Sequence, residues 1–204
     1  MSLFTRLAER SWESPGSQHR APETYRPPAA KVLLILYFGV AAVLFGLITS
    51  AYLMRMGMPG MAHGPMGGWR ALPEPLLLWV NTGILMLASV AWEGARIVSR
   101  ERRPVGWGAA AGLLGLLFLA GQLLLWDRLT DAGHGLRGDP AAAFFYLITG
   151  LHGLHVIGGL YFWARAMLAS GDEGNAALRF QLTASYWHFL LLVWLLMLGL
   201  FVAT

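Results

Sequence analysis

Residues 180–202 read FQLTASYWHFLLLVWLLMLGLFV, a stretch of 23 residues without a single Asp, Glu, Lys or Arg. At about 1.5 Å per residue, a helix of this length spans about 35 Å, which is enough to cross the roughly 30 Å hydrocarbon core of a bilayer. A backbone in hydrocarbon must satisfy its own hydrogen bonds, and a helix does so within one segment. The stretch therefore predicts a membrane-spanning α-helix.

Four further apolar stretches of similar length precede it, approximately over residues 32–54, 75–95, 105–126 and 141–164. Of the 204 residues, 56% are hydrophobic and 13% charged, whereas a soluble domain carries about 25% charged residues. The sequence predicts an all-α integral membrane bundle of five transmembrane helices. Residues 1–30 form a polar N-terminal segment, and residues 31–204 form the transmembrane domain.

The basic residues are distributed unequally between the two sides of the predicted bundle. Eleven would lie on one side: Arg6, Arg10, Arg20, Arg26, Lys31, Arg96, Arg100, Arg102, Arg103, Arg165 and Arg179. Four would lie on the other: Arg55, Arg70, Arg128 and Arg137. Because cytoplasmic loops retain positive charge, we expect a cytoplasmic N-terminus and a periplasmic C-terminus. This arrangement accounts for the net charge of +4, so we expect no nucleic-acid partner.

The sequence lacks the motifs of a self-sufficient enzyme. It contains no cysteine, which excludes disulfides, thiolate metal sites, iron–sulfur clusters and thiol nucleophiles. No phosphate-binding loop, Gly-x-Ser-x-Gly elbow or HExxH zinc motif is present. We therefore expect no catalytic residue in this chain.

A few polar side chains fall inside the predicted spans, where they are costly to keep and are candidates for function. Asn81 is expected to bond to a neighbouring helix. Glu93 precedes Arg96 and Arg100 by about one and two turns, which favours an interfacial ion pair. A proton-carrying role for Glu93 is the alternative.

Three histidines also fall inside the spans. His152 and His155 share one face of the fourth helix, and His188 lies in the fifth. Neutral imidazoles of this kind could ligate haem or copper. Alternatively, each ring bonds a carbonyl, a lipid headgroup, or a hydroxyl such as that of Thr149 or Tyr186.

The loop after the first span, MRMGMPGMAHGPMGGW, is rich in methionine. Thioethers select Cu(I), so this loop is a weak candidate for binding copper, although methionine also serves as apolar filler. The candidate ligands are Met56, Met58, Met61, His63 and Met66.

Glycines in the third and fourth spans predict close helix packing. The candidates are Gly108 and Gly112 in the third span and Gly150 and Gly153 in the fourth.

Three motifs resemble subunit III of the haem–copper oxidases. FYLITGLHGLHVIGG, at residues 145–159, is similar to the FxxxTGxHGxHVxxG run of that family, and YWHFLLLVW, at residues 186–194, is similar to its YWHFxDxVW run. LPEPLLLWVNTGILMLAS, at residues 72–89, resembles a third family helix. The resemblance covers all five spans, in the order of the short bacterial form.

This resemblance implies a noncatalytic subunit of a respiratory oxidase in a bacterial inner membrane. The chain itself would hold no cofactor, haem and copper being in subunit I, beside which it would pack, with subunit II also in the complex. It would stabilise the complex, bind phospholipid in a cleft between helices, and support proton uptake by subunit I. His152, His155, Trp187 and His188 would be bundle-core or lipid-cleft groups, and Arg96 and Arg100 would face inner-leaflet headgroups.

Two acidic positions of the family are apolar here. Ala42 stands where many members have an intramembrane carboxylate, and Leu191 replaces the aspartate of the YWHFxD run. A proton role through those two carboxylates therefore does not carry over. Three alternatives stay open: an accessory protein of a nitric oxide reductase, a membrane haem protein, and a copper-binding protein.

Overall fold

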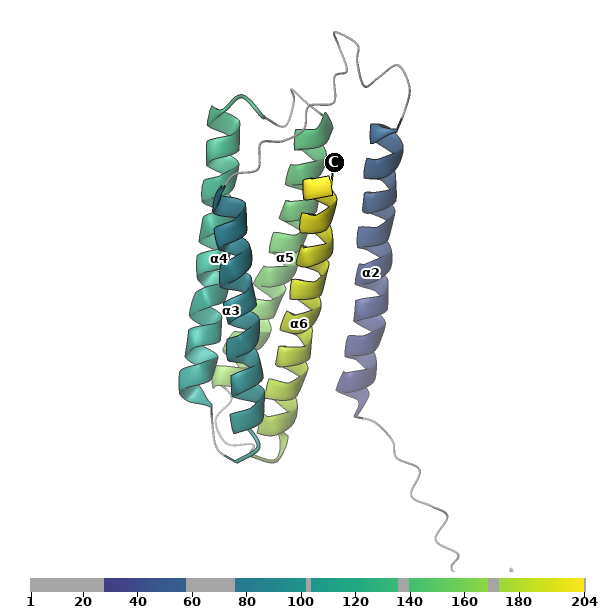
Figure 1. The fold of residues 1–204 in the computed structure, drawn as a ribbon. Helices are drawn as coiled ribbons and strands as arrows, with labels where there is room; N and C mark the ends of the chain where they lie inside the picture. Colours follow the sequence, from purple (N-terminus) through teal and green to yellow (C-terminus); the bar gives the residue numbers. More distant parts are fainter. Residues whose placement is uncertain (1–27, 58–75, 102–103, 136–139, 169–172, 204) are drawn as a thin grey trace, which may run out of the picture.

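The computed structural model describes residues 28–57, 76–101, 104–135, 140–168 and 173–203 (Figure 1). They form five helices: α2 (Ala29–Met56), α3 (Leu76–Val98), α4 (Val105–Asp131), α5 (Pro140–Leu168) and α6 (Glu173–Ala203). All five are long and apolar enough to cross a membrane. The predicted all-α bundle of five spans is confirmed. The N-terminal segment lies outside the described residues, apart from its last three.

The helices extend beyond the predicted apolar stretches. The structure begins α6 at Glu173, seven residues before the predicted start, and continues α4 to Asp131. An apolar stretch ends at the first charged residue, whereas a helix can continue into the headgroup region. Proline directly precedes three of the helices in the sequence, at Pro28 before α2, Pro75 before α3 and Pro104 before α4.

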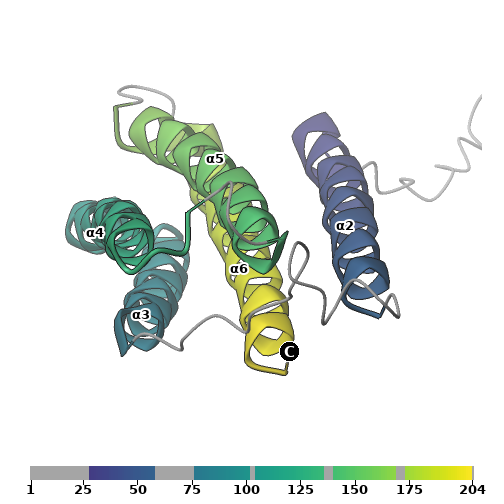
Figure 2. The same ribbon diagram turned by 90° about the horizontal axis from the view of Figure 1, so that it is seen from above.

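Four of the helices form a closed core, and the fifth is attached to one side of it. Helices α3, α4, α5 and α6 pack in a ring, each against the next, while α2 packs on α5 and α6 only. Figure 2 shows α2 standing beside the other four. Only Ala41, Phe45 and Tyr52 of α2 are buried. Helix α2 is therefore held by far fewer side chains than the other helices.

Aromatic side chains fill the centre of the ring. Trp92 of α3 and Trp187 of α6 are buried and stacked, with ring centroids 5.9 Å apart. Phe118 of α4 meets Trp194 of α6 edge-on at 5.1 Å. Trp194 also donates from Nε1 to the Thr82 hydroxyl at 2.9 Å. The core therefore combines large ring surfaces with internal hydrogen bonds, as membrane helix packing requires.

A groove of glycines along α4 receives large side chains from its neighbours. The side chains facing Gly108, Gly112, Gly115 and Gly121 are Met167, Trp163, Trp187 and Asn81, in that order. In addition, Trp163 donates from Nε1 to the carbonyl of Gly108 at 2.7 Å. Gly108 and Gly112 therefore face large side chains of α5, and their role in close helix packing stays a prediction.

The two predicted packing glycines of α5 are less constrained. A Cβ atom at Gly150 would meet the Trp126 ring at 3.3 Å, and one at Gly153 would meet only Leu119, at 3.8 Å. The second distance is an ordinary van der Waals contact. Gly112 is therefore the sharper site for testing the packing.

We predict that Gly112→Ala destabilises the protein, by about 1–3 kcal/mol, because the added methyl overpacks the space that the Trp163 ring occupies. The matched control is Gly106→Ala in the same helix, where a Cβ meets nothing within 4 Å. Thermal unfolding in mild detergent measures both. A Gly112→Ala midpoint equal to that of Gly106→Ala would show that the glycine groove is not tightly packed.

Candidate functional site

A cavity of about 860 Å³ lies where α2 meets α5 and α6. Its wall is mostly apolar and aromatic, with Leu33 and Leu34 contributed by α2 and Phe162 by α5. Helix α2 has only three buried residues and packs against α5 and α6 alone among the described helices, which leaves space beside it. Its shape and lining suit a hydrocarbon chain rather than a polar metabolite.

Tyr186 joins all three helices that line this cavity. Its hydroxyl donates to the backbone carbonyl of His155 at 2.8 Å, and its oxygen lies 3.1 Å from the hydroxyl of Tyr37. Since the Tyr186 proton is used toward His155, Tyr37 donates to Tyr186. The Tyr37 and Tyr186 rings are also stacked, with centroids 5.6 Å apart. This pair is a polar connection between α2 and the ring.

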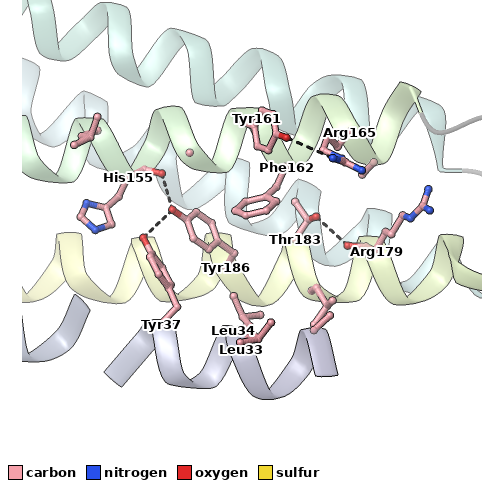
Figure 3. A pocket seen from close by; sticks show the side chains of 15 residues that line it. Leu33, Leu34, Tyr37, His155, Tyr161, Phe162, Arg165, Arg179, Thr183 and Tyr186 are labelled. Carbon is pink, nitrogen blue, oxygen red and sulfur yellow. Dashed lines mark hydrogen bonds between the residues drawn. The ribbon is translucent and has the colours of Figure 1, made fainter. Parts of the chain in front are cut away.

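Two arginines lie together at one end of the cavity, and His155 lies toward the other (Figure 3). Arg165 is near the end of α5, and donates to the hydroxyl of Tyr161 at 3.4 Å. Arg179 is near the start of α6, and its carbonyl accepts from Thr183 at 2.9 Å. The cavity thus has a cationic end at a helix terminus and an apolar interior.

His155 is the one predicted site histidine that lines the cavity. Its Nδ1 lies 2.7 Å from the carbonyl of Leu151 and therefore carries the proton that it donates. Its ring packs against Phe45 and Tyr37, at centroid distances of 5.4 and 6.0 Å. The expectation that a carbonyl satisfies an intramembrane histidine is confirmed here.

His152 is a core residue and does not line the cavity. It is fully buried, and its ring contacts Phe118 and Trp194 at centroid distances of 5.8 and 5.1 Å. Neither ring nitrogen has a hydrogen-bond partner among the described residues. Trp187 is likewise buried in the core, against Trp92.

His188 lies at the seam between α3 and α6. Its Nδ1 is 2.5 Å from the hydroxyl of Ser89, and its Nε2 is 3.2 Å from a carboxylate oxygen of Glu93. Glu93 also accepts from Arg96, through Nε at 2.8 Å and through Nη2. The predicted Glu93–Arg96 ion pair is confirmed, whereas Arg100 lies exposed in the turn after α3.

The three intramembrane histidines therefore occupy three different surroundings: a core, a cavity wall and a helix seam. Within the described residues, no group of three or more His, Asp or Glu side chains could hold a metal ion. Of the copper candidates, Met56 ends α2. Met58, Met61, His63 and Met66 lie outside the described residues.

Other predictions can also be compared with the geometry. Asn81 donates to the carbonyl of Phe118 on α4 at 3.4 Å, which confirms the expected bond to another helix. Thr149 accepts from Trp126 at 3.0 Å and not from a histidine. Ala42 and Leu191 stand at the two positions where the family carboxylates were expected. Ala42 is exposed on α2, and Leu191 is partly buried on α6.

The resemblance implied a lipid cleft between helices, but the sequence did not indicate which helices line it. Nothing in the sequence indicated that Tyr37 contacts Tyr186, or that Arg165 and Arg179 line the same cavity. The two arginines are 14 positions apart and come to the same end of the cavity only because α5 and α6 fold back on each other. The available signal was that both arginines flank the same short connection between two spans.

Comparison with known proteins gives one consistent result. The family model described as cytochrome c oxidase subunit III matches residues 31–203. Cytochrome c oxidase subunit 3 of Synechocystis sp. is 31% identical over 179 residues, covering 83% of this chain and 74% of that protein. The Thermostichus vulcanus protein of the same name is 28% identical, covering 92% and 94%. Cytochrome bo(3) ubiquinol oxidase subunit 3 of Pseudomonas putida is 28% identical, covering 78% of each chain.

We predict that Tyr186→Phe loosens α2 from the ring, because it removes the donor to His155 and leaves the Tyr37 hydroxyl without its acceptor. Losing hydrogen bonds of this kind costs about 1–2 kcal/mol. Hydrogen–deuterium exchange of α2 in the purified protein is expected to rise. Tyr161→Phe, which loses only the contact with Arg165, serves as the control, and equal exchange in the two variants would contradict the assignment.

Proposed function

The chain belongs to the cytochrome c oxidase subunit III family, and on that premise we propose that it is a noncatalytic subunit that stabilises a haem–copper terminal oxidase of a bacterial inner membrane. The observation that carries the proposal is the extent of the match, since residues 31–203 include all five membrane helices. Relatives named for cytochrome c and for ubiquinol oxidases share this subunit.

The proposed partner is subunit I, with subunit II in the same complex. Haem and copper would belong to those partners. The separation of His152, His155 and His188 supports this division of labour. The distribution of basic residues supports a cytoplasmic N-terminus.

We place a phospholipid in the cavity between α2, α5 and α6. The apolar wall fits an acyl chain, and Arg165 and Arg179 lie at the end where a headgroup phosphate would sit. In the proposed orientation this end faces the cytoplasm, where basic side chains attract anionic lipids. Arg96 and Arg100 do not line this cavity, and their expected contact with inner-leaflet headgroups stays a prediction.

Support of proton uptake would then be indirect. Ala42 and Leu191 cannot carry a proton, so a role through these positions is not available to this chain. A bundle that holds lipid and packs against subunit I would act by keeping the catalytic subunit in its working structure.

We predict that the chain, tagged at its N-terminus and extracted from native membranes in mild detergent, is recovered in a stoichiometric complex with a haem–copper subunit I. Mass spectrometry of the complex identifies that subunit, and hence distinguishes an oxidase from a nitric oxide reductase. Recovery of the tagged chain by itself would refute the accessory role and favour the haem and copper hypotheses.

The lipid assignment predicts that replacing Arg165 and Arg179 together by Gln lowers the anionic phospholipid retained by the purified complex several-fold. Zwitterionic lipid is expected to change little, because only the charge at the headgroup end is removed. Arg128→Gln, at the opposite end of the bundle, is the control. Equal retention of phosphatidylglycerol in all three proteins would exclude the two arginines as a headgroup site.

A further inference from the structure

The seam between α3 and α6 carries two polar rows, in which Ser89 is buried and the other members are partly or fully exposed. Ser89, Glu93 and Arg96 follow one another at helical spacing on α3. Gln181, Ser185 and His188 do the same on α6. We call these six residues the polar seam. Contacts of His188 with Ser89 and Glu93 join the two rows.

The polar seam is partly exposed on the isolated chain. The side chains of Glu93, His188 and Arg96 keep 37%, 42% and 29% of their surface accessible. Measured from the ends of the predicted apolar stretches, His188 lies eight residues beyond Phe180, or about 12 Å along the helix axis, and Glu93 lies two residues before Ala95, or about 3 Å. The seam therefore runs from near the headgroup level at Glu93 to below it at His188.

Other outer faces of the bundle have a different character. On α2 the exposed side chains include Leu36, Val40 and Leu47, and on α4 they include Leu113 and Leu117. These faces suit contact with lipid tails. Ionised side chains facing lipid tails are costly, and in membrane proteins they face the bundle interior or a water-filled cavity, or pair with other groups.

We infer that the polar seam is the surface through which this subunit docks onto a transmembrane helix of another oxidase subunit. The inference rests on the proposed function. Glu93 is already neutralised by Arg96 and bonded by His188, so the partner helix presents neutral hydrogen-bonding or small side chains and no unpaired charge. Such a helix covers the exposed side chains of the polar seam and forms hydrogen bonds with the side chains of Gln181 and Ser185.

Single-cysteine crosslinking tests this inference in the intact complex, because the chain contains no cysteine of its own. Ser185→Cys and Gln181→Cys place a thiol on the seam. Leu117→Cys on α4 and Leu36→Cys on α2 place one on apolar faces. Each tagged variant is labelled in native membranes with a benzophenone maleimide, illuminated, and purified with its complex. Mass spectrometry then identifies the adducts.

We expect position 185, with position 181 in support, to give adducts with another oxidase subunit at several-fold higher yield than positions 117 and 36. An intact complex in which the seam positions give no more protein adduct than the apolar positions would overturn the docking surface and leave the proposed function standing. Rapid labelling of position 185 by a membrane-impermeant maleimide in the intact complex would also overturn it, since the seam would then face water. If no subunit accompanies any variant, both proposals fall.

Discussion

The cost of an unpaired polar group in hydrocarbon governs most of this structure. It confines the backbone to helices, and it also determines where the polar side chains go. Thr82, Thr149 and Thr183 each bond to a carbonyl one turn earlier in their own helix. Glu93 is bonded to Arg96 and His188, and Tyr186 connects to α2 and α5. Some polar groups are thus satisfied within their own helix, while Glu93, His188 and Tyr186 connect different helices.

The same constraint explains why α2 differs from the other helices. The ring of α3 to α6 is sealed by tryptophans seated in the glycine groove of α4. Helix α2 has few buried residues, and the Tyr37–Tyr186 contact is a polar connection between it and the ring. A helix attached in this way leaves room beside it, which is where the cavity lies. A tight ring and a loosely held helix suit an accessory subunit that binds lipid at one side.

Without carboxylates at positions 42 and 191, the chain cannot carry protons through these two positions. Ala42 and Leu191 have no titratable group, and His152 is enclosed by aromatic rings in the core. Among the other ionisable groups of the described helices, Glu93, Arg96 and His188 lie at the seam, and Arg165 and Arg179 lie at the cationic end of the cavity. The two proposals assign a protein helix to the seam and a lipid to the cavity.

Sequence alone was sufficient for the number of spans, the all-α class, the family and the ion pair of Glu93 with Arg96. These follow from apolar stretches of membrane length, local motifs and helical spacing, which involve neighbouring residues only. It could not separate His152 in the core from His155 at a cavity, although they are three residues apart. It could not show that Arg165 and Arg179 lie at the same end of one cavity, or that His188 contacts Glu93. These contacts depend on how each helix is rotated about its axis and packed against its neighbours. Only the tertiary structure decides that, because the side chains in contact come from distant parts of the chain.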